Sequence, residues 1–587
     1  LATVQATLGI AHPTGYPLFT IIGYVFLSLP LPFTKIFLAN SLAAILCSLT
    51  IVLFLKSLKI ILHNISINQP KIKNIETVKI CTTIFSGLVL AFSETFWFQS
   101  TSVEVYSLQV FLIMSIIYLL LKTFYSSLES DYQKKGWYFL AIMLALGFSN
   151  HMTTILIIPG IAFLFFTKEK FNKDSFKKVS LMLLFFIPVL AIIYAYLPIR
   201  AAQNPILNWG NPVDLERFFR HFTGKQYQVW LFSSFTSAKQ QLIYFIRNLP
   251  GEFTVFSLFF VIVGIIYSYK FFRKIFFFLM ISFLVTVLYS INYDINDIDS
   301  YFLLAYLSLA FFSFFGLLKI FQFVSSKGLS NTICAIIIGL FVLVQFYWNF
   351  DKVDQSDIYT FEDYTKAVLS STETNSVIFS YQWDYFISAS YYFQFVENFR
   401  ADVTVIDKEL LRRSWYYRQL QTNNPEVLSG MHSEIIDFNN AIMPFERGEK
   451  YDSNLLEKYY RRIMTGLILK NIDERNYYIG PELVENELRR GEFSLPDGYT
   501  IVPQLFLFKI TRGDEYVPAP DPNYHIRFPS RTNRYVEFIE RIATTMLLNR
   551  TIYELRYDKI DRARIYIQKL KKEFPKYRIP AQFESLL

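Results

Sequence analysis

Over its first 350 residues the chain alternates long apolar runs with short polar breaks. A helix that crosses a bilayer needs about 20 mostly apolar residues. Runs that meet or approach this length predict spanning helices at residues 36–61, 79–98, 105–125, 179–197, 240–267, 275–291, 301–320 and 332–350. The pattern therefore predicts an α-helical multi-pass membrane domain over residues 1–350.

Two further apolar stretches do not fit a simple span. Residues 136–161 are interrupted by Ser149, Asn150 and His151, which predicts two short helices that meet at a polar corner. Residues 14–29 form a short apolar stretch that Pro30 and Pro32 end. We expect residues 14–29 to lie along the membrane surface without crossing it.

The distribution of positive charge predicts the orientation of these helices. If residues 36–61 run from the outer face inwards, the outer loops 1–13, 99–104, 149–152 and 292–300 contain no Lys or Arg. The inner loops then hold the basic clusters, which are Lys71, Lys73, Lys79, Lys134, Lys135, Lys168, Lys170, Lys173, Lys177, Lys178, Lys270, Arg273, Lys274, Lys319 and Lys327. Lys35 and the long outer loop 198–239 are the basic exceptions.

This orientation puts the polar residues that interrupt apolar sequence on the outer side. They are His12, Glu94, Glu104, Asn150, His151, Arg200 and the acidic stretch 294–299. Ionisable groups near membrane depth are costly and usually functional. We therefore expect the outer face to carry a site for chemistry.

The pattern changes after residue 350. Residues 351–587 are charged, contain no spanning segment and begin on the outer side. Strand patterns at 375–380 and 403–406 enclose a helical pattern at 383–397, which predicts a βαβ unit. Further strands are expected at 477–480 and 504–510, and a closing helical pair at 534–548 and 559–574. This soluble α/β domain with a helical C-terminus lacks a Gly-rich nucleotide loop.

The composition agrees with a membrane protein and argues against a wholly soluble or nucleic-acid-binding protein. Hydrophobic residues make up 53% of the 587 residues and charged residues 18%, against about 25% charged in soluble domains. The net charge of +9 comes from the loops between apolar runs, so we expect a lipid bilayer and no nucleic acid as partner. The three cysteines lie inside apolar runs and read as small hydrophobic residues.

Two candidate clusters lie early in the chain. In GIAHPTGYP, His12 and the Gly15 backbone are candidates to approach a phosphate or sugar, although the motif could be only a helix entry. In FSETFWFQSTSVEVYSLQ, Glu94 and Glu104 flank a short outer turn with Tyr106 nearby. A first-turn acid at Glu104 would also complement a helix dipole.

Two more clusters follow on the same face. In GFSNHMT, Asn150 and His151 are candidate ligand contacts, although a lone His is often a buried, satisfied residue. In the loop 198–239, Arg200 is a candidate to hold a lipid phosphate bidentately. Asn211 is expected to cap a short amphipathic helix over 214–222, which would float in the membrane interface and could serve only to anchor headgroups.

The last cluster is NYDINDIDSYF, which places Asp294, Asp297 and Asp299 at a short outer loop. It is either a solvated turn or a site for a metal ion or sugar hydroxyls. No metal-ligand spacing is present.

Taken together, GIAHPTGYPLF, SVEVYSL, GFSNHMT, YLPIRAAQNPILNWGNP with HFTGKQY, and NYDINDIDSYF resemble a bacterial membrane family long catalogued as a domain of unknown function. Its animal relatives are the plexin-type protein O-mannosyltransferases of the GT-C superfamily. The resemblance implies an integral-membrane, inverting glycosyltransferase of a bacterial cytoplasmic membrane, with its C-terminal domain on the periplasmic side. Its donor would be a polyprenyl-phosphate sugar, mannose-like, and its acceptor an exported protein or envelope component.

The resemblance also implies roles for residues. The catalytic candidates are Glu104, Asp297 and His12, and the substrate-binding candidates are Arg200, His151, Asn150, Glu94, Tyr106, Trp209 and Asp294. Relatives carry an acidic pair just before the position that matches Leu1, so the main acid and a first helix are expected upstream. Beyond the lipid-linked sugar no cofactor is implied, and a divalent metal stays open. A lipid or solute transporter (a flippase) or a non-catalytic membrane scaffold is the alternative.

Overall fold

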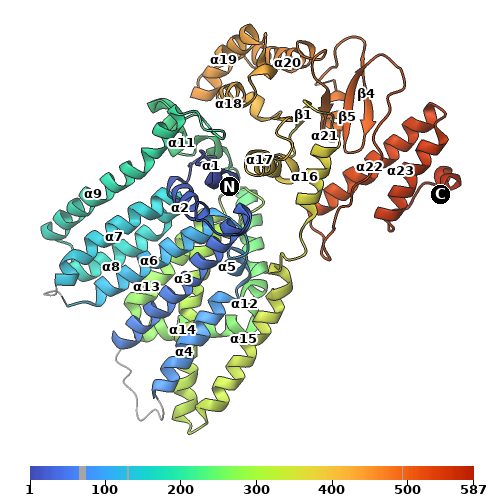
Figure 1. Ribbon diagram of the computed structural model, residues 1–587. Coiled ribbons are helices and arrows are strands. Elements are labelled where there is room, and N and C mark those ends of the chain that lie inside the picture. Colours follow the sequence, from blue (N-terminus) through green and yellow to red (C-terminus); the bar gives the residue numbers. More distant parts are fainter. Residues whose placement is uncertain (65–74, 128–130, 492) are drawn as a thin grey trace. The chain divides into compact units, whose positions relative to one another are not determined.

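The computed structural model describes all residues except 65–74, 128–130 and 492, and the side chains of 131–134. Lys71, Lys73 and the side chain of Lys134 therefore lie outside the described residues. The chain forms two compact units: Leu1–Pro205 with Asn211–Asp354, and Ile206–Gly210 with Gln355–Leu587 (Figure 1).

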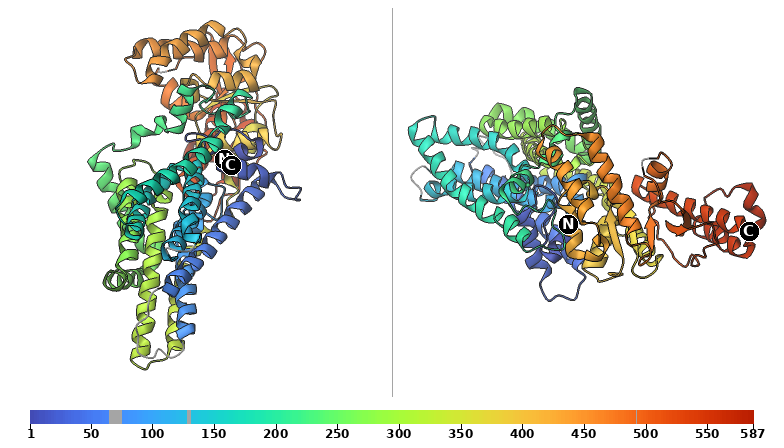
Figure 2. Two further views of the ribbon diagram at one scale, coloured as in Figure 1. Left: turned by 90° about the vertical axis from the view of Figure 1, so that its left-hand side faces the viewer. Right: turned by 90° about the horizontal axis from the view of Figure 1, so that it is seen from above.

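The first unit is a bundle of long helices that run side by side (Figures 1 and 2). Its helices, with the 3₁₀ turns η1 to η3, are α1 (Ala2–Thr7), α2 (Pro17–Leu27), α3 (Lys35–Asn64), α4 (Ile75–Ala91), α5 (Glu94–Phe98), α6 (Val105–Tyr125), α7 (Asp131–Asn150), η1 (Met152–Ile157), α8 (Ile158–Glu169), α9 (Lys173–Tyr194), α10 (Tyr196–Ala202), α11 (Leu215–Phe222), η2 (Lys225–Trp230), α12 (Phe235–Phe271), α13 (Arg273–Ser290), η3 (Asp299–Phe302), α14 (Leu303–Ser326) and α15 (Asn331–Val353).

The predicted multi-pass membrane fold is confirmed. Within the described residues, eight helical segments are long and apolar enough to cross a membrane: Lys35–Asn64, Val105–Tyr125, Met152–Glu169, Lys173–Ala202, Phe235–Phe271, Arg273–Ser290, Asp299–Ser326 and Asn331–Val353. Helix α2 has only 11 residues, which is too short to cross a bilayer at 1.5 Å per residue.

Two predicted helices differ from the structure. The stretch 79–98 was expected to be one span, but α4 ends at Ala91 and α5 begins at Glu94. The break is stable because the carboxylate of Glu252 on α12 accepts the backbone N–H of Thr95 at 2.7 Å and its hydroxyl at 2.9 Å. The polar corner at Asn150–His151 is confirmed, but neither helix beside it is short, since α7 has 20 residues and the second segment has 18.

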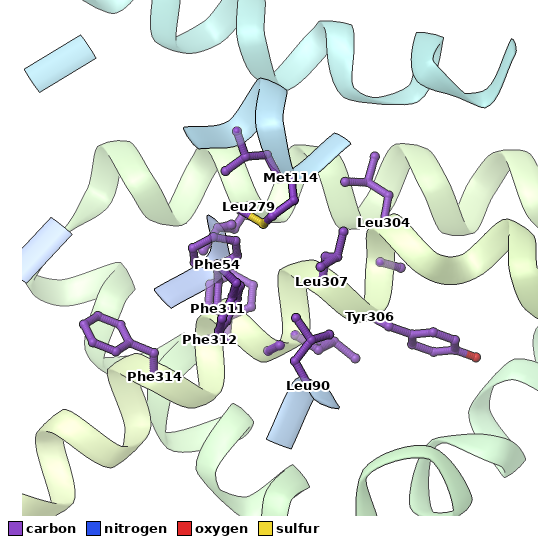
Figure 3. Close-up of a cluster of buried hydrophobic side chains, with 14 of the residues drawn as sticks. Phe54, Leu90, Met114, Leu279, Leu304, Tyr306, Leu307, Phe311, Phe312 and Phe314 are labelled. Atoms are coloured by element: carbon purple, nitrogen blue, oxygen red, sulfur yellow. The ribbon is translucent and has the colours of Figure 1, made fainter. Parts of the chain in front are cut away.

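The core of the first unit forms around α14, which is apolar on all sides and almost wholly buried. Figure 3 shows Phe311 and Phe312 of α14 beside Phe54 of α3, Leu90 of α4 and Met114 of α6. Helices α12 and α14 approach each other at Gly264 and Gly316, where the backbones are too close for any side chain.

The second unit is built on a five-stranded sheet in the order β2-β1-β3-β5-β4. Its strands are β1 (Val377–Ser380), β2 (Thr404–Asp407), β3 (Tyr477–Ile479), β4 (Tyr499–Gln504) and β5 (Leu507–Arg512). Strand β1 pairs in parallel with β2 and β3, whereas β5 pairs antiparallel with β3 and β4.

The predicted βαβ unit is confirmed, because η4 (Trp383–Ile387) and α17 (Ser388–Phe395) connect β1 to β2. The strand expected over 504–510 is found as β5, which begins later, at Leu507, and the preceding strand β4 was not predicted. The chain turns at Leu505, whose φ of +53° is left-handed, and so forms the β4–β5 hairpin. The expected strand therefore straddled this turn.

The helices of the second unit come before, between and after the strands along the chain. They and the short turns are α16 (Thr360–Ser370), η5 (Leu410–Arg412), α18 (Tyr416–Asn423), η6 (Pro425–Leu428), α19 (His432–Arg447), α20 (Ser453–Leu469), α21 (Pro481–Leu483), η7 (Val484–Leu488), α22 (Arg534–Arg556), α23 (Ile560–Glu573) and η8 (Ala581–Leu586). The expected closing helical pair is confirmed as α22 and α23, with α22 continuing past the predicted end at 548.

We predict that Gly264→Ala destabilises the first unit by about 1–3 kcal/mol. A Cβ at this position would lie 1.7 Å from the carbonyl oxygen of Phe312, so α12 and α14 must move apart. Thermal unfolding of the purified protein in detergent should show a lower Tm. Gly339→Ala is the matched control, since its Cβ would meet Phe85 at an ordinary 3.6 Å. Equal Tm values for the two variants would contradict the close crossing.

Candidate functional site

Aromatic and imidazole rings from four separate segments meet in the first unit. The ring of His151 stacks on Tyr16 at 5.7 Å with an interplanar angle of 3°. Tyr106 and Tyr301 approach the same imidazole at 5.3 and 5.8 Å between ring centroids. We call His12, Tyr16, Tyr106, His151 and Tyr301 the histidine–tyrosine cluster. It brings together three residues predicted from sequence, His12, Tyr106 and His151.

His12 joins the cluster through Tyr16. The Tyr16 hydroxyl lies 3.1 Å from Nε2 of His12 and donates to the carbonyl of Pro13 at 3.3 Å. Because that hydroxyl donates elsewhere, it can accept the Nε2 proton of His12. Burial lowers the pKa of His12 to about 4, so this imidazole is neutral near pH 7. The ring of Tyr227 flanks its other side at 6.0 Å.

Glu104 lies directly before α6, beside Tyr106 of the cluster. It is half-buried, whereas Asp297 is exposed. Burial raises the pKa of Glu104, the amino group of Leu1 and a hydrogen bond from the Val105 backbone lower it, and the negative charge of Asp297 raises it. The two predicted catalytic carboxylates are therefore close enough to interact electrostatically. A carboxylate with a raised pKa is suited to take up a proton.

Asn150 is the last residue of α7 and His151 caps η1, and their side chains make different contacts. The Asn150 amide donates to the Val105 carbonyl at 3.1 Å and to Oε1 of Gln109 at 3.0 Å, so it ties α7 to α6. Nδ1 of His151 accepts the backbone N–H of Thr153 at 3.2 Å. Burial lowers the pKa of His151 to about 4, and this imidazole is neutral too.

Arg200 holds the start of the His12 loop. Its Nε donates to the Leu8 carbonyl at 2.7 Å, its Nη2 to the Thr7 carbonyl at 3.3 Å and its Nη1 to Gln203 at 2.6 Å. Carbonyls at the end of a helix are favourable partners for a cation. The guanidinium thus fixes the end of α1, and its expected contact with a lipid phosphate stays a prediction.

Three other predicted binding residues lie apart from these contacts. Glu94 forms an ion pair with Lys352 at 2.6 Å. Asp294 is exposed and accepts from Ser233 at 3.0 Å. Trp209 belongs to the second unit, where it packs on Trp383 and Trp415 at 5.4 and 5.3 Å between ring centroids.

The helix expected after Asn211 is also shifted. Asp214 caps α11 by accepting the backbone N–H of Arg217 at 2.8 Å, so the predicted cap at Asn211 is wrong. The preceding segment up to Gly210 folds with the second unit. Within the described residues, no three His, Cys, Asp or Glu side chains gather to hold a metal ion.

Sequence reasoning missed Tyr16, Tyr301 and His221. The two tyrosines carry no local signal among 39 in the chain. His221 on α11 is buried, and burial lowers its pKa to about 3. Its Nε2 lies against Gly15, since a Cβ on that glycine would come within 2.9 Å of it. The pairing of His221 with Gly15 could not be read from either segment alone.

We predict that Gly15→Ala destabilises the protein by about 1–3 kcal/mol beyond backbone strain alone. Its φ is +87°, and the new Cβ would also lie 2.9 Å from Cδ2 of Leu197. Gly328→Ala is the control, because its φ is +69° and nothing lies within 4 Å of its Cβ position. Thermal unfolding should show a lower Tm for Gly15→Ala than for Gly328→Ala, and equal values would contradict the packing of His221 on this loop.

Comparison with known proteins links both units to one group. Residues 1–175 match the family described as protein O-mannosyl-transferase TMEM260 N-terminal domain, and residues 361–457 match TMEM260-associated domain 2. The chain is 23% identical over 610 residues to protein O-mannosyl-transferase tmem260 of Dictyostelium discoideum, which covers 91% of this chain and 67% of that protein. It is 24% identical over 454 residues to protein O-mannosyl-transferase TMEM260 of Mus musculus, and this alignment covers 73% of this chain and 61% of that protein. The chain spans about two thirds of the length of these relatives. The relation to protein O-mannosyltransferases that the sequence motifs indicated is thus confirmed.

Proposed function

We propose that this protein is a membrane glycosyltransferase whose reaction takes place at the histidine–tyrosine cluster. It moves a mannose-like sugar from a polyprenyl phosphate to a hydroxyl of an exported protein or envelope acceptor, with inversion at the sugar carbon. The observation that carries the proposal is the position of Glu104 directly before α6, beside Tyr106 of the cluster, where burial raises the pKa of its carboxyl group. Glu104 and Tyr106 lie within the part of the chain that matches the TMEM260 N-terminal domain, whereas Asp297 lies beyond it.

The reaction needs a base and a way to stabilise the leaving phosphate. Glu104 takes the proton of the acceptor hydroxyl as the oxygen bonds to the sugar carbon. The bond from that carbon to the phosphate oxygen breaks, and its electron pair leaves with the polyprenyl phosphate. Burial keeps the pKa of Glu104 high, and the negative charge of Asp297 adds to this effect.

The cluster supplies neutral groups for binding. His12 and His151 are neutral near pH 7 because burial lowers both pKa values to about 4. A neutral imidazole offers one N–H donor and one acceptor, which suits sugar hydroxyls and phosphate oxygens. The rings of Tyr106 and Tyr301 lie beside His151, at 5.3 and 5.8 Å between ring centroids. Arg200 serves the site by holding Leu8, and a direct phosphate contact would require it to exchange one of these bonds.

The positive-inside pattern supports an outward-facing site, with the second unit on the same side as the acceptor. The resemblance to a bacterial membrane family supports a location in a bacterial cytoplasmic membrane. The second unit would then be periplasmic and could help to select the acceptor.

We predict that full-length protein in membranes transfers label from polyprenyl-phosphate mannose to an exported protein, and that Glu104→Gln lowers the rate about 10²–10⁴-fold. The amide cannot take the proton but keeps the shape of the side chain. Glu76→Gln is the matched control, since Glu76 is an exposed residue paired with Lys79. Labelled product is measured after equal expression of each variant.

Equal rates for Glu104→Gln and wild type would remove Glu104 as the base. Absence of transfer from any polyprenyl-phosphate sugar would contradict the enzyme itself and favour a scaffold or transporter.

A further inference from the structure

The corner between α7 and η1 holds His151 in one tautomer. Nδ1 of this ring accepts the backbone N–H of Thr153 at 3.2 Å, and an accepting nitrogen carries no proton. The Thr153 hydroxyl lies 2.8 Å from the same nitrogen. In the neutral ring the proton is therefore on Nε2, which becomes a hydrogen-bond donor.

A chain of amides and hydroxyls behind the corner supports this arrangement. Gln109 donates to the Thr154 hydroxyl at 2.9 Å, and that hydroxyl donates to the His151 carbonyl at 2.9 Å. The Gln109 amide also approaches the Thr153 hydroxyl at 3.5 Å. With Gln109 as a donor on one side, the Thr153 hydroxyl is free to give its own proton to Nδ1. Asn150 in turn fixes Gln109 by donating to Oε1 at 3.0 Å.

The rings of the cluster fix where Nε2 points. Tyr16 stacks parallel to the imidazole, Tyr106 lies tilted to it at 46°, and Tyr301 meets it edge to face at 77°. The ring therefore cannot rotate without losing these contacts and its bond to Thr153. No residue in the described part of the chain accepts a hydrogen bond from Nε2. A donor that is oriented by its partners but has no acceptor of its own indicates a ligand oxygen.

We propose that Thr153 is a positioning residue that holds His151 as an Nε2–H donor to an oxygen of the lipid-linked sugar. The inference rests on the proposed function for the identity of that ligand. The oxygen belongs either to the phosphate or to the sugar, and both would accept the same bond. Thr153 itself touches no ligand, because its hydroxyl faces Nδ1.

The test compares Thr153→Val with Thr153→Ser. Valine keeps the backbone N–H and the shape but removes the hydroxyl, whereas serine keeps the hydroxyl. We expect nitrogen-15 spectra of histidine-labelled full-length protein to show a new population of His151 with the proton on Nδ1 in Thr153→Val. Thr153→Ser should retain the wild-type signal, and His151→Gln identifies this resonance among the six histidines.

Binding supplies the second measurement. The affinity for polyprenyl-phosphate mannose should fall about tenfold in Thr153→Val, as expected for one misplaced hydrogen bond, and recover in Thr153→Ser. Thr167→Val is the control, because the Thr167 hydroxyl donates to the Phe163 carbonyl of its own helix at 2.7 Å. An equal fall for polyprenyl phosphate without sugar assigns the oxygen to the phosphate, and a fall for the mannosylated lipid alone assigns it to the sugar.

Wild-type affinity and an unchanged histidine spectrum in Thr153→Val would overturn the inference. These outcomes are separate from the fate of the proposed reaction. A changed spectrum and weakened lipid binding, without sugar transfer by the wild type, would keep the role of Thr153 and reject glycosyl transfer. Normal sugar transfer together with unchanged lipid binding in Thr153→Val would keep glycosyl transfer and reject the role of Thr153.

Discussion

Backbone groups inside an apolar helix bundle have no water to bind, so each break in a helix needs a polar partner from the protein. Three breaks in the first unit meet this need with a side chain. The pairs are Thr95 with Glu252, Thr153 with His151, and Leu8 with Arg200. In the last two pairs, the side chain that closes the break also belongs to the candidate site or holds its loop. At these two breaks, the residues that satisfy the backbone are therefore also residues of the candidate site or residues that hold its loop.

The same constraint explains which helices could be predicted from sequence. Residues 105–125 were predicted with the bounds that α6 has, because a long apolar run between polar ends is a local signal. The break at Asn150 was also visible, since polar residues interrupt the run. The break before Glu94 was not placed, because its partner Glu252 lies 157 residues away. In the second unit the β4–β5 turn at Leu505 was missed, because leucine carries no turn signal at a left-handed position.

The candidate site divides along similar lines. His12, Glu104 and His151 were identifiable because each is a polar residue in apolar surroundings. Tyr16, Tyr301 and His221 join the same region only through contacts between distant segments, and a tyrosine or histidine in a mixed segment gives no warning of this. Trp209 follows Arg200 closely in sequence but folds with the second unit. Closeness along the chain therefore led to the inclusion of Trp209, which lies outside the cluster, and gave no reason to include Tyr301.

Burial shifts the pKa of the carboxyl group and the pKa values of the imidazoles in this region in opposite directions. The reason is the same for both, because a charged form is costly away from water. The pKa of Glu104 rises, and those of His12, His151 and His221 fall. Near pH 7 the histidines are neutral donors and acceptors. A buried cation would need a permanent counter-ion whenever an anionic ligand is absent, whereas an oriented N–H costs only one unmade hydrogen bond. A cluster of neutral histidines and tyrosines can therefore offer hydrogen bonds to an anionic ligand without leaving a buried cation unpaired when that ligand is absent.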